Sequence, residues 1–153
     1  MNDGDRRRTG RSRDELRQRR VRLQREWHAH HGNRRVLLIS GLPDEQTLYT
    51  MQLERCGFQA AVERSPDGAF DKALRSEPAV VVVDYSTAGD SLGLVRKLRS
   101  DARTEAACIV MVSSHVRAQD RVAAEHAGVD LFLTKPCLPE TMTEHIARLL
   151  KPD

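Results

Sequence analysis

The sequence predicts an α/β domain in which a five-stranded parallel sheet carries helices on both faces. The first observation is a run of four valines at residues 80–83 that ends in Asp84. β-branched residues favour strands, and a run that is apolar on both alternating faces is typical of a central strand covered on both sides. The second observation is that similar short apolar runs alternate with helix-like segments. This alternation predicts parallel strands linked by right-handed helical crossovers.

The third observation concerns the residues at the ends of the expected helices. Pro43 and Pro66 stand where helices are expected to begin, and Gly57 and Gly128 stand where helices are expected to end. Proline suits the first turn of a helix, and glycine suits the left-handed residue that follows the last turn. Strands are therefore predicted at residues 35–39, 58–62, 80–83, 108–112 and 131–133, and helices at residues 43–56, 66–75, 92–98, 117–127 and 139–150.

Residues 1–33 form an Arg-rich arm ahead of the α/β domain, which we place at residues 34–153. Residues 1–35 hold twelve arginines against five acidic residues, so the basic balance of the chain is concentrated there. Residues 1–11 contain almost no apolar side chain and are expected to be disordered. Clustered arginine attracts polyanions. No recognised DNA-binding motif accompanies the arm, so specific binding to nucleic acid is not expected.

The second half of the arm predicts a helix. Ser12 is followed three residues later by a glutamate, which is the spacing of a capping box, and residues 13–29 are good helix formers. Leu16, Leu23 and Trp27 fall on one side of that helix. We expect this extra helix to dock on the domain or on a second copy of the chain, with Trp27 packing against protein rather than stacking on a nucleic-acid base.

Composition argues against several classes of protein. No apolar run reaches the roughly 18 residues of a membrane span, and the basic N-terminus lacks the apolar core of a signal peptide. A cytoplasmic protein is therefore expected. His28, His30 and His31 are interpreted as a solvated helix end rather than as a metal site. The cysteines are odd in number and widely spaced, which predicts neither disulfides nor a zinc site: Cys56, Cys108 and Cys137.

Polar residues gather where the predicted strands end. The first strand is followed by Ser40 and Gly41, the third ends in Asp84, the fourth leads into Ser113, and the fifth is closely followed by Lys135. In open parallel sheets, ligands and chemistry collect at the carboxyl ends of the strands. An aspartate, a hydroxyl and a lysine are thus expected to converge on one pocket.

These residues resemble the receiver domain of two-component response regulators. The likeness covers about residues 34–151, and its most specific piece is the G-V-D and L-T-K-P sequence within residues 128–136. The apolar strand that ends in Asp84 and the placement of Ser113 add to it. The resemblance implies a flavodoxin-like fold with strand order 2-1-3-4-5. A receiver domain is not expected to be an enzyme with turnover of its own.

The resemblance also implies roles for individual residues. Asp84 matches the aspartate that takes a phosphoryl group from a histidine kinase or phosphotransfer protein, and a carboxylate is a competent nucleophile for a reactive donor. Lys135 would pair with one phosphoryl oxygen, and Ser113 would donate a hydrogen bond to another. Phe132 falls at the family's aromatic switch position. The peptide bond before Pro136 is expected to be cis, as in the family.

The likeness departs from the family at the end of the first strand. Receivers normally carry two adjacent acids there, which bind Mg²⁺ together with the phosphoacceptor, but this chain has Ser40 and Gly41. Asp84 is then the one matched acidic ligand for a metal. Asp44 and Glu45 follow shortly, but a helix that begins at a proline is expected to point both elsewhere. Mg²⁺ binding, and with it metal-dependent phosphorylation, is the weakest element of the interpretation.

Other interpretations compete with the phosphoacceptor. Asp84 could be a loop acid that is simply salt-bridged to Lys135, Ser113 a helix cap, and Phe132 plain core. The domain would then be a degenerate receiver that docks on proteins without phosphate. In either case, the downstream partner is expected on the surface formed by the helices at 117–127 and 139–150. A homodimer is a further expectation.

Overall fold

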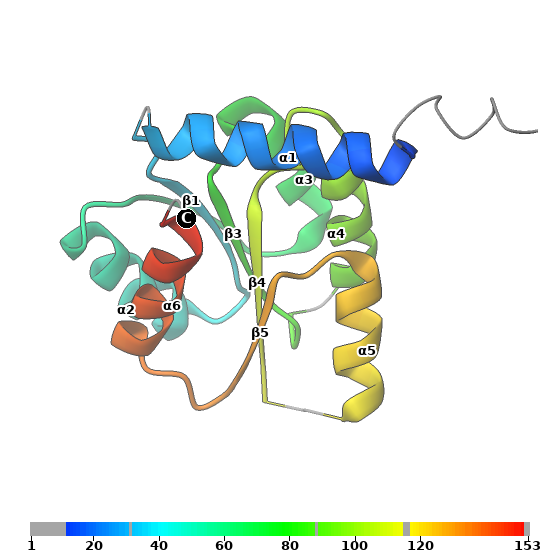
Figure 1. The fold of residues 1–153 in the computed structure, drawn as a ribbon. Coiled ribbons are helices and arrows are strands. Elements are labelled where there is room, and N and C mark those ends of the chain that lie inside the picture. Colours follow the sequence, from blue (N-terminus) through cyan, green and yellow to red (C-terminus); the bar gives the residue numbers. More distant parts are fainter. Residues whose placement is uncertain (1–11, 31, 88, 115–116, 152–153) are drawn as a thin grey trace, which may run out of the picture.

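Five parallel strands form one sheet in the computed structural model of the chain (Figure 1). The order is β2-β1-β3-β4-β5, as expected. The strands are β1 Arg35–Ile39, β2 Gln59–Glu63, β3 Val80–Asp84, β4 Cys108–Ser113 and β5 Leu131–Thr134. The structure describes residues 12–30, 32–87, 89–114 and 117–151, without the side chains of residues 28–30.

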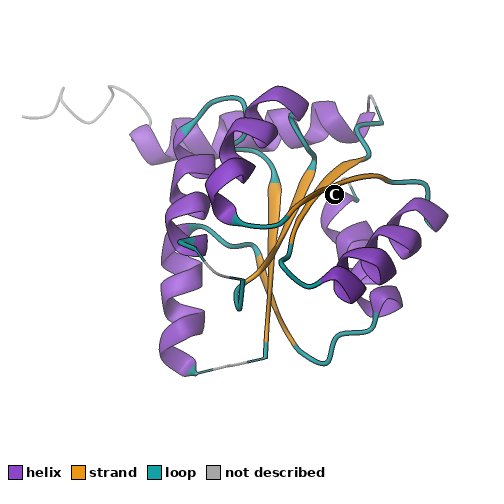
Figure 2. Ribbon diagram, turned by 180° about the vertical axis from the view of Figure 1, so that it is seen from behind, coloured by secondary structure: helices purple, strands orange, loops and turns teal. Residues whose placement is uncertain are grey.

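Helices cover both faces of the sheet. They are α1 Arg13–His30, α2 Pro43–Arg55, α3 Pro66–Ser76, α4 Ser91–Ser100, α5 Ala118–Ala127 and α6 Pro139–Leu150. Helices α2 and α6 pack on one face, while α3, α4 and α5 pack on the other (Figures 1 and 2). The extra helix α1 crosses the edge of the sheet where the strands begin (Figure 1).

The central strand β3 explains why the sheet is buried on both sides. All five of its residues are buried. Val80 and Val82 contribute to the core beneath α2 and α6, while Val81 and Val83 contribute to the core beneath α3, α4 and α5. Successive side chains of a strand point to opposite faces, so an unbroken valine run supplies both cores at once.

The end of α2 shows how glycine sets the start of the next strand. Gly57 has a φ of 86°, a left-handed conformation that glycine adopts without a steric penalty. The N–H of Gly57 donates to the carbonyl of Glu54, and the N–H of Phe58 donates to the carbonyl of Leu53. This pair of bonds is a Schellman motif. Phe58 therefore belongs to the helix cap, and β2 begins one residue later than predicted.

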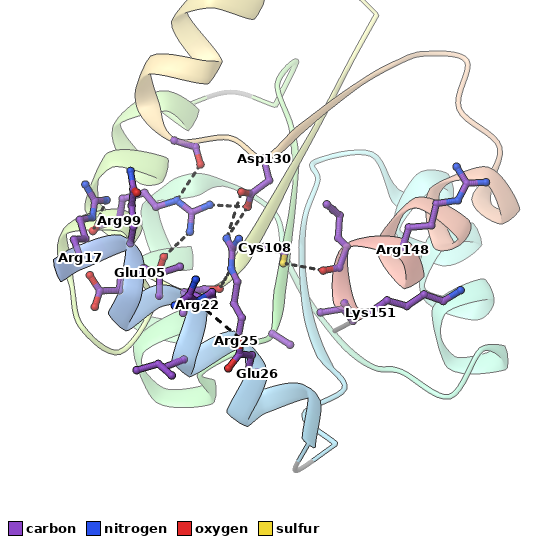
Figure 3. A pocket seen from close by; sticks show the side chains of 18 of the residues that line it. Arg17, Arg22, Arg25, Glu26, Arg99, Glu105, Cys108, Asp130, Arg148 and Lys151 are labelled. Carbon is purple, nitrogen blue, oxygen red and sulfur yellow. Dashed lines mark hydrogen bonds and ion pairs between the residues drawn. The ribbon is translucent and has the colours of Figure 1, made fainter. Parts of the chain in front are cut away.

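Helix α1 docks on the domain through arginines. The Arg20 guanidinium makes two hydrogen bonds to the Glu105 carboxylate, at 2.5 and 2.9 Å. Arg25 donates to the carbonyl of Ala106 and pairs with Asp130 at 3.1 Å. Figure 3 shows Arg25 and Arg99 converging on Asp130 beneath the helix, and Arg99 lies 2.7 Å from that carboxylate. The contact is polar, and a pocket of about 1070 Å³ remains beside α1 (Figure 3).

The apolar side of α1 is not what holds it on the domain. The side chains of Leu16, Leu23 and Trp27 are 52%, 51% and 55% exposed. Within this chain, the Trp27 side chain therefore stays more than half exposed. Arginine has a planar fork of donors that suits carboxylates and carbonyls, so the polar face of the helix makes the contact.

Some expectations lie beyond the described residues. The predicted disorder of residues 1–11 and the solvated cluster of His28, His30 and His31 fall on residues or side chains that the structure does not describe. Within the described ranges, no helix is both long and apolar enough to cross a membrane. All three cysteines are free thiols.

Candidate functional site

The carboxyl edge of the sheet brings Asp84 and Lys135 together. Asp84 ends β3 and is 2% exposed. The Lys135 ammonium lies 2.8 Å from its Oδ2 atom. The backbone N–H of Lys135 donates to the carbonyl of Ser113, which fixes the lysine beside the end of β4. The Lys135–Pro136 peptide bond is cis in the structure.

A second carboxylate enters this site from α2. Glu45 lies in the first turn of the helix, and its Oε1 atom is 2.8 Å from the Lys135 ammonium. Its Oε2 atom accepts a hydrogen bond of 2.5 Å from the Ser40 hydroxyl. The expectation that the proline-started helix points Glu45 elsewhere is wrong, because the first turn of α2 sits directly above the end of β1. Asp44, in the same turn, is exposed as expected.

The loop after β3 holds the other oxygen of Asp84. The Oδ1 atom accepts hydrogen bonds from the backbone N–H of Ser86 at 2.9 Å and from the Ser86 hydroxyl at 2.6 Å. Thr87 ties this loop to the one after β1, since its hydroxyl accepts from the N–H of Gly41 at 3.1 Å. Ser86 escaped prediction, although a serine two residues after an aspartate is a known turn-forming arrangement.

The pKa values of Glu45 and Asp84 are shifted in opposite directions. Burial raises the pKa of Glu45, and its hydrogen bond with Asp84 raises that pKa further, against the opposing effects of Lys135 and Ser40. Burial also acts to raise the pKa of Asp84, but hydrogen bonds from Glu45, Lys135 and Ser86 outweigh it, so the net shift is downward. Adjacent acids commonly separate in this way. The pKa of Glu45 is therefore the higher of the two, and Glu45 takes up a proton before Asp84 does as the pH falls.

Lys135 stays charged in this environment. Burial acts to lower its pKa, but hydrogen bonds to Asp84 and Glu45 outweigh this effect, and the net shift is upward. Its positive charge lies 2.8 Å from a carboxyl oxygen of Asp84 and 2.8 Å from one of Glu45.

The Glu45→Gln variant should show a flatter dependence of stability on pH. A raised pKa means that the folded protein holds the Glu45 proton more tightly than the unfolded chain does. Native stability should therefore fall as pH rises above the unfolded value of about 4.3 and through the folded pKa. Glutamine does not titrate, so that loss should vanish. Urea unfolding at a series of pH values measures it, with Asp44→Asn as the matched control. Parallel curves for native protein and Glu45→Gln would contradict this assignment.

The two carboxylates of this site suit Mg²⁺, although they form a small set of protein ligands. Mg²⁺ is commonly bound through one or two carboxylates, with water and phosphate oxygens completing the shell. Asp84 and Glu45 supply two carboxylates that share Lys135 as a neighbour. Neither at this site nor anywhere else among the described residues is there a group of three or more histidine, cysteine, aspartate or glutamate side chains that could hold a metal ion. Glu45 thus provides an acid near the end of the first strand, where this chain has Ser40 and Gly41 in place of two acids.

Ser113 and Phe132 lie on the neighbouring strands β4 and β5. Ser113 is 1% exposed at the end of β4, and it is in register with Thr134 of β5. Phe132 is half-buried in β5 and packs against the core beneath α3, α4 and α5. The Arg121 guanidinium of α5 lies 5.7 Å from the centre of the Phe132 ring. The structure thus places both residues on the two strands that flank the Lys135 loop.

Similar proteins are found in bacteria. The chain is 28% identical over 117 residues to protein PilH of Pseudomonas aeruginosa, a match that covers 76% of this chain and 97% of that protein. It is 25% identical over 119 residues to the phosphate regulon transcriptional regulatory protein PhoB of Klebsiella pneumoniae, covering 77% of this chain. The chain spans about half of PhoB, 52% of its length. No family model matches the chain.

Solved structures agree on the fold. The BeF3-activated N-terminal receiver domain of RstA from Klebsiella pneumoniae superposes with a TM-score of 0.70 at 21% identity, covering 77% of this chain and 99% of that one. The chemotaxis response regulator CheY4 of Vibrio cholerae gives a TM-score of 0.70 at 18% identity, covering 75% and 97%. The shared part therefore spans about three quarters of the chain.

Proposed function

We propose that this chain, a CheY-like receiver domain of the response-regulator family in two-component signalling, accepts a phosphoryl group on Asp84. The observation that carries the proposal is the pairing of a buried, ionised Asp84 with Lys135 at the carboxyl edge of the sheet. A receiver domain is not an enzyme in the ordinary sense, so the proposed chemistry is the gain and loss of one phosphoryl group.

The proposed transfer follows from the positions of these groups. An Asp84 carboxylate oxygen forms a bond to phosphorus while the bond between phosphorus and the donor's leaving atom breaks, and the leaving group takes that electron pair. Phosphoryl transfer depends chiefly on positioning and on neutralising charge. Lys135 already touches Oδ2 and would stay beside a phosphoryl oxygen. Ser86 orients the carboxylate through Oδ1, and the Ser113 hydroxyl is proposed to donate to another phosphoryl oxygen.

Asp84 and Glu45 are the residues that would hold Mg²⁺. A bound Mg²⁺ ion would neutralise negative charge on the phosphoryl oxygens. The ion would bind the ionised form of Glu45, and a raised pKa disfavours that form. We therefore expect a higher Mg²⁺ requirement than in a receiver with two ionised acids after its first strand.

The intact mass of the protein after incubation with acetyl phosphate tests this function. The native protein should gain one phosphoryl group, and Asp84→Asn should gain none, because the amide is not a nucleophile for the donor. Asp44→Asn, which changes an exposed acid of the neighbouring turn, should behave like the native protein. Titration of Mg²⁺ shows whether the reaction depends on the metal. An adduct on Asp84→Asn would place the phosphoryl group elsewhere and sink the proposal.

A second function is favoured by the contacts that Lys135 makes within the chain. Its ammonium lies 2.8 Å from the carboxyl groups of both Asp84 and Glu45. That arrangement suits a degenerate receiver that docks on other proteins without being phosphorylated. The absence of any adduct on native protein, even at high Mg²⁺ and donor, would select this alternative.

The receiver family implies a histidine kinase as partner. We place the downstream partner on the surface formed by α5, β5 and α6. Val122 on α5 is 51% exposed there, and Leu138 before α6 is 66% exposed. Phe132 lies between this surface and the core, so an inward turn of its ring would report phosphorylation to the partner. Nucleic acid is not proposed as a partner.

A further inference from the structure

An uncovered apolar stripe runs along α1. Leu16, Leu23 and Trp27 are each more than half exposed, although leucine and tryptophan side chains are normally covered by protein. On a helix of 3.6 residues per turn these positions lie within about 40° of one another. The stripe therefore faces one direction over nearly three turns of the helix.

The stripe lies beside the face that docks on the domain. The docking contacts come from Arg17, Arg20, Gln24 and Arg25. Arg20 and Gln24 stand next to the stripe and, with Arg19, complete a groove of about 490 Å³ along it. The domain thus holds α1 by one side and leaves the neighbouring side, with its groove, turned outward.

The charged residues of α1 that do not contact the domain have no net charge. Three of its six arginines are engaged by the domain: Arg17, Arg20 and Arg25. The helix has three further arginines, Arg13, Arg19 and Arg22. It also has three acids, Asp14, Glu15 and Glu26, so the two sets are equal in number. A surface with no net charge does not repel a copy of itself, whereas a partner of one strong charge would gain little from it.

The charges flanking the stripe are also self-complementary. Arg19 and Glu26 are seven residues apart and lie on the same flank of the stripe. Antiparallel pairing about a two-fold axis near Arg22 sets Arg19 beside the partner's Glu26. The same axis sets Trp27 beside the partner's Leu16. In both pairs, the two residues lie level along the helix axis to within the rise of one residue, about 1.5 Å.

We propose that α1 is a homodimerisation helix, which pairs antiparallel with α1 of a second copy through Leu16, Leu23 and Trp27. The two-fold axis makes the interface isologous, so each contact occurs twice. Trp27 fills the groove beside the partner's Leu16, and the two Leu23 side chains meet near the axis. This inference does not depend on phosphorylation, since α1 lies at the edge of the sheet opposite Asp84.

Sedimentation velocity over a range of protein concentrations tests the dimer. The native chain should shift from monomer to dimer as its concentration rises. Trp27→Glu should weaken the dimer by about 30-fold or more, the usual effect of losing a large aromatic contact at an interface, here lost twice. Leu48→Glu, which alters an equally exposed leucine on α2, should leave the dimer unchanged. Circular dichroism checks that each variant is folded.

A charge exchange tests the antiparallel register. Arg19→Glu and Glu26→Arg should each weaken the dimer, because each places like charges opposite one another across the axis. The double variant should recover it. A native chain that stays monomeric at every concentration would overturn the proposal. So would a dimer that survives Trp27→Glu, or one that is broken instead by Val122→Glu on α5.

Discussion

Asp130→Ala is expected to lower the free energy of unfolding by about 2 kcal/mol, because hydrogen bonds to a charged group contribute about 1.5–3 kcal/mol each and Asp130 is partly exposed. The Asp130 carboxylate lies 2.7 Å from Arg99, whose side chain is only 10% exposed, and 3.1 Å from Arg25 of α1. It also accepts a 2.8 Å hydrogen bond from the N–H of Ile109. Alanine leaves the buried Arg99 guanidinium without its counter-charge.

Urea unfolding followed by circular dichroism measures this loss. Asp130→Asn should fall between native protein and Asp130→Ala, because the amide oxygen can still accept from Ile109 while the charge is gone. Asp101→Ala removes an acid from an exposed pair with Arg103 and should change little, as surface pairs contribute little. If Asp130→Ala proved as stable as Asp101→Ala, Arg99 would not need a counter-charge and the account of this network would be wrong.

Lys135→Met is expected to slow phosphorylation of Asp84 by about 100-fold, comparable to the loss of one preorganised charge-stabilising donor in other active sites. Methionine has nearly the length of lysine but no charge. Without the ammonium, Asp84 and Glu45 face each other with no cation on either. The pKa of Asp84 should rise, because the hydrogen bond from Lys135 helps to lower it.

The initial rate of adduct formation from acetyl phosphate at several pH values measures both effects. In Lys135→Met, the rate should fall further as pH decreases, since protonated Asp84 is not a nucleophile. Lys135→Arg is the control, because it keeps the positive charge in a different shape and should retain more of the rate. A Lys135→Met rate near that of native protein would mean that the lysine only holds the loop in place.

Local sequence rules predict most of the fold. The valine run of β3 and the glycines that end α2 and α5 act within a few residues of the chain, so they can be interpreted without a structure. The convergence of Asp84 and Lys135 was also predictable, because strands of a parallel sheet end at one edge. Element ends differ by a residue where a cap intervenes, as at Phe58.

Besides the local turn at Ser86, two features that were not predicted depend on tertiary contacts. Glu45 enters the site because the first turn of α2 lies close to the end of β1, a relation that helix propensity does not contain. An acid in the first turn of a helix that directly follows a strand was the available signal. The docking of α1 depends on Glu105 and Asp130, in loops far along the chain. No pattern within the arm could identify those partners.

The position of α1 at the edge where the strands begin has a consequence for signalling output. Two domains joined at that edge would each keep the Asp84 site at the opposite edge of the sheet, away from the joint. Such a pair would be bivalent, because binding of one domain to a clustered partner raises the effective concentration of the other domain. Weak contacts of a single domain could then add up to durable binding of that partner.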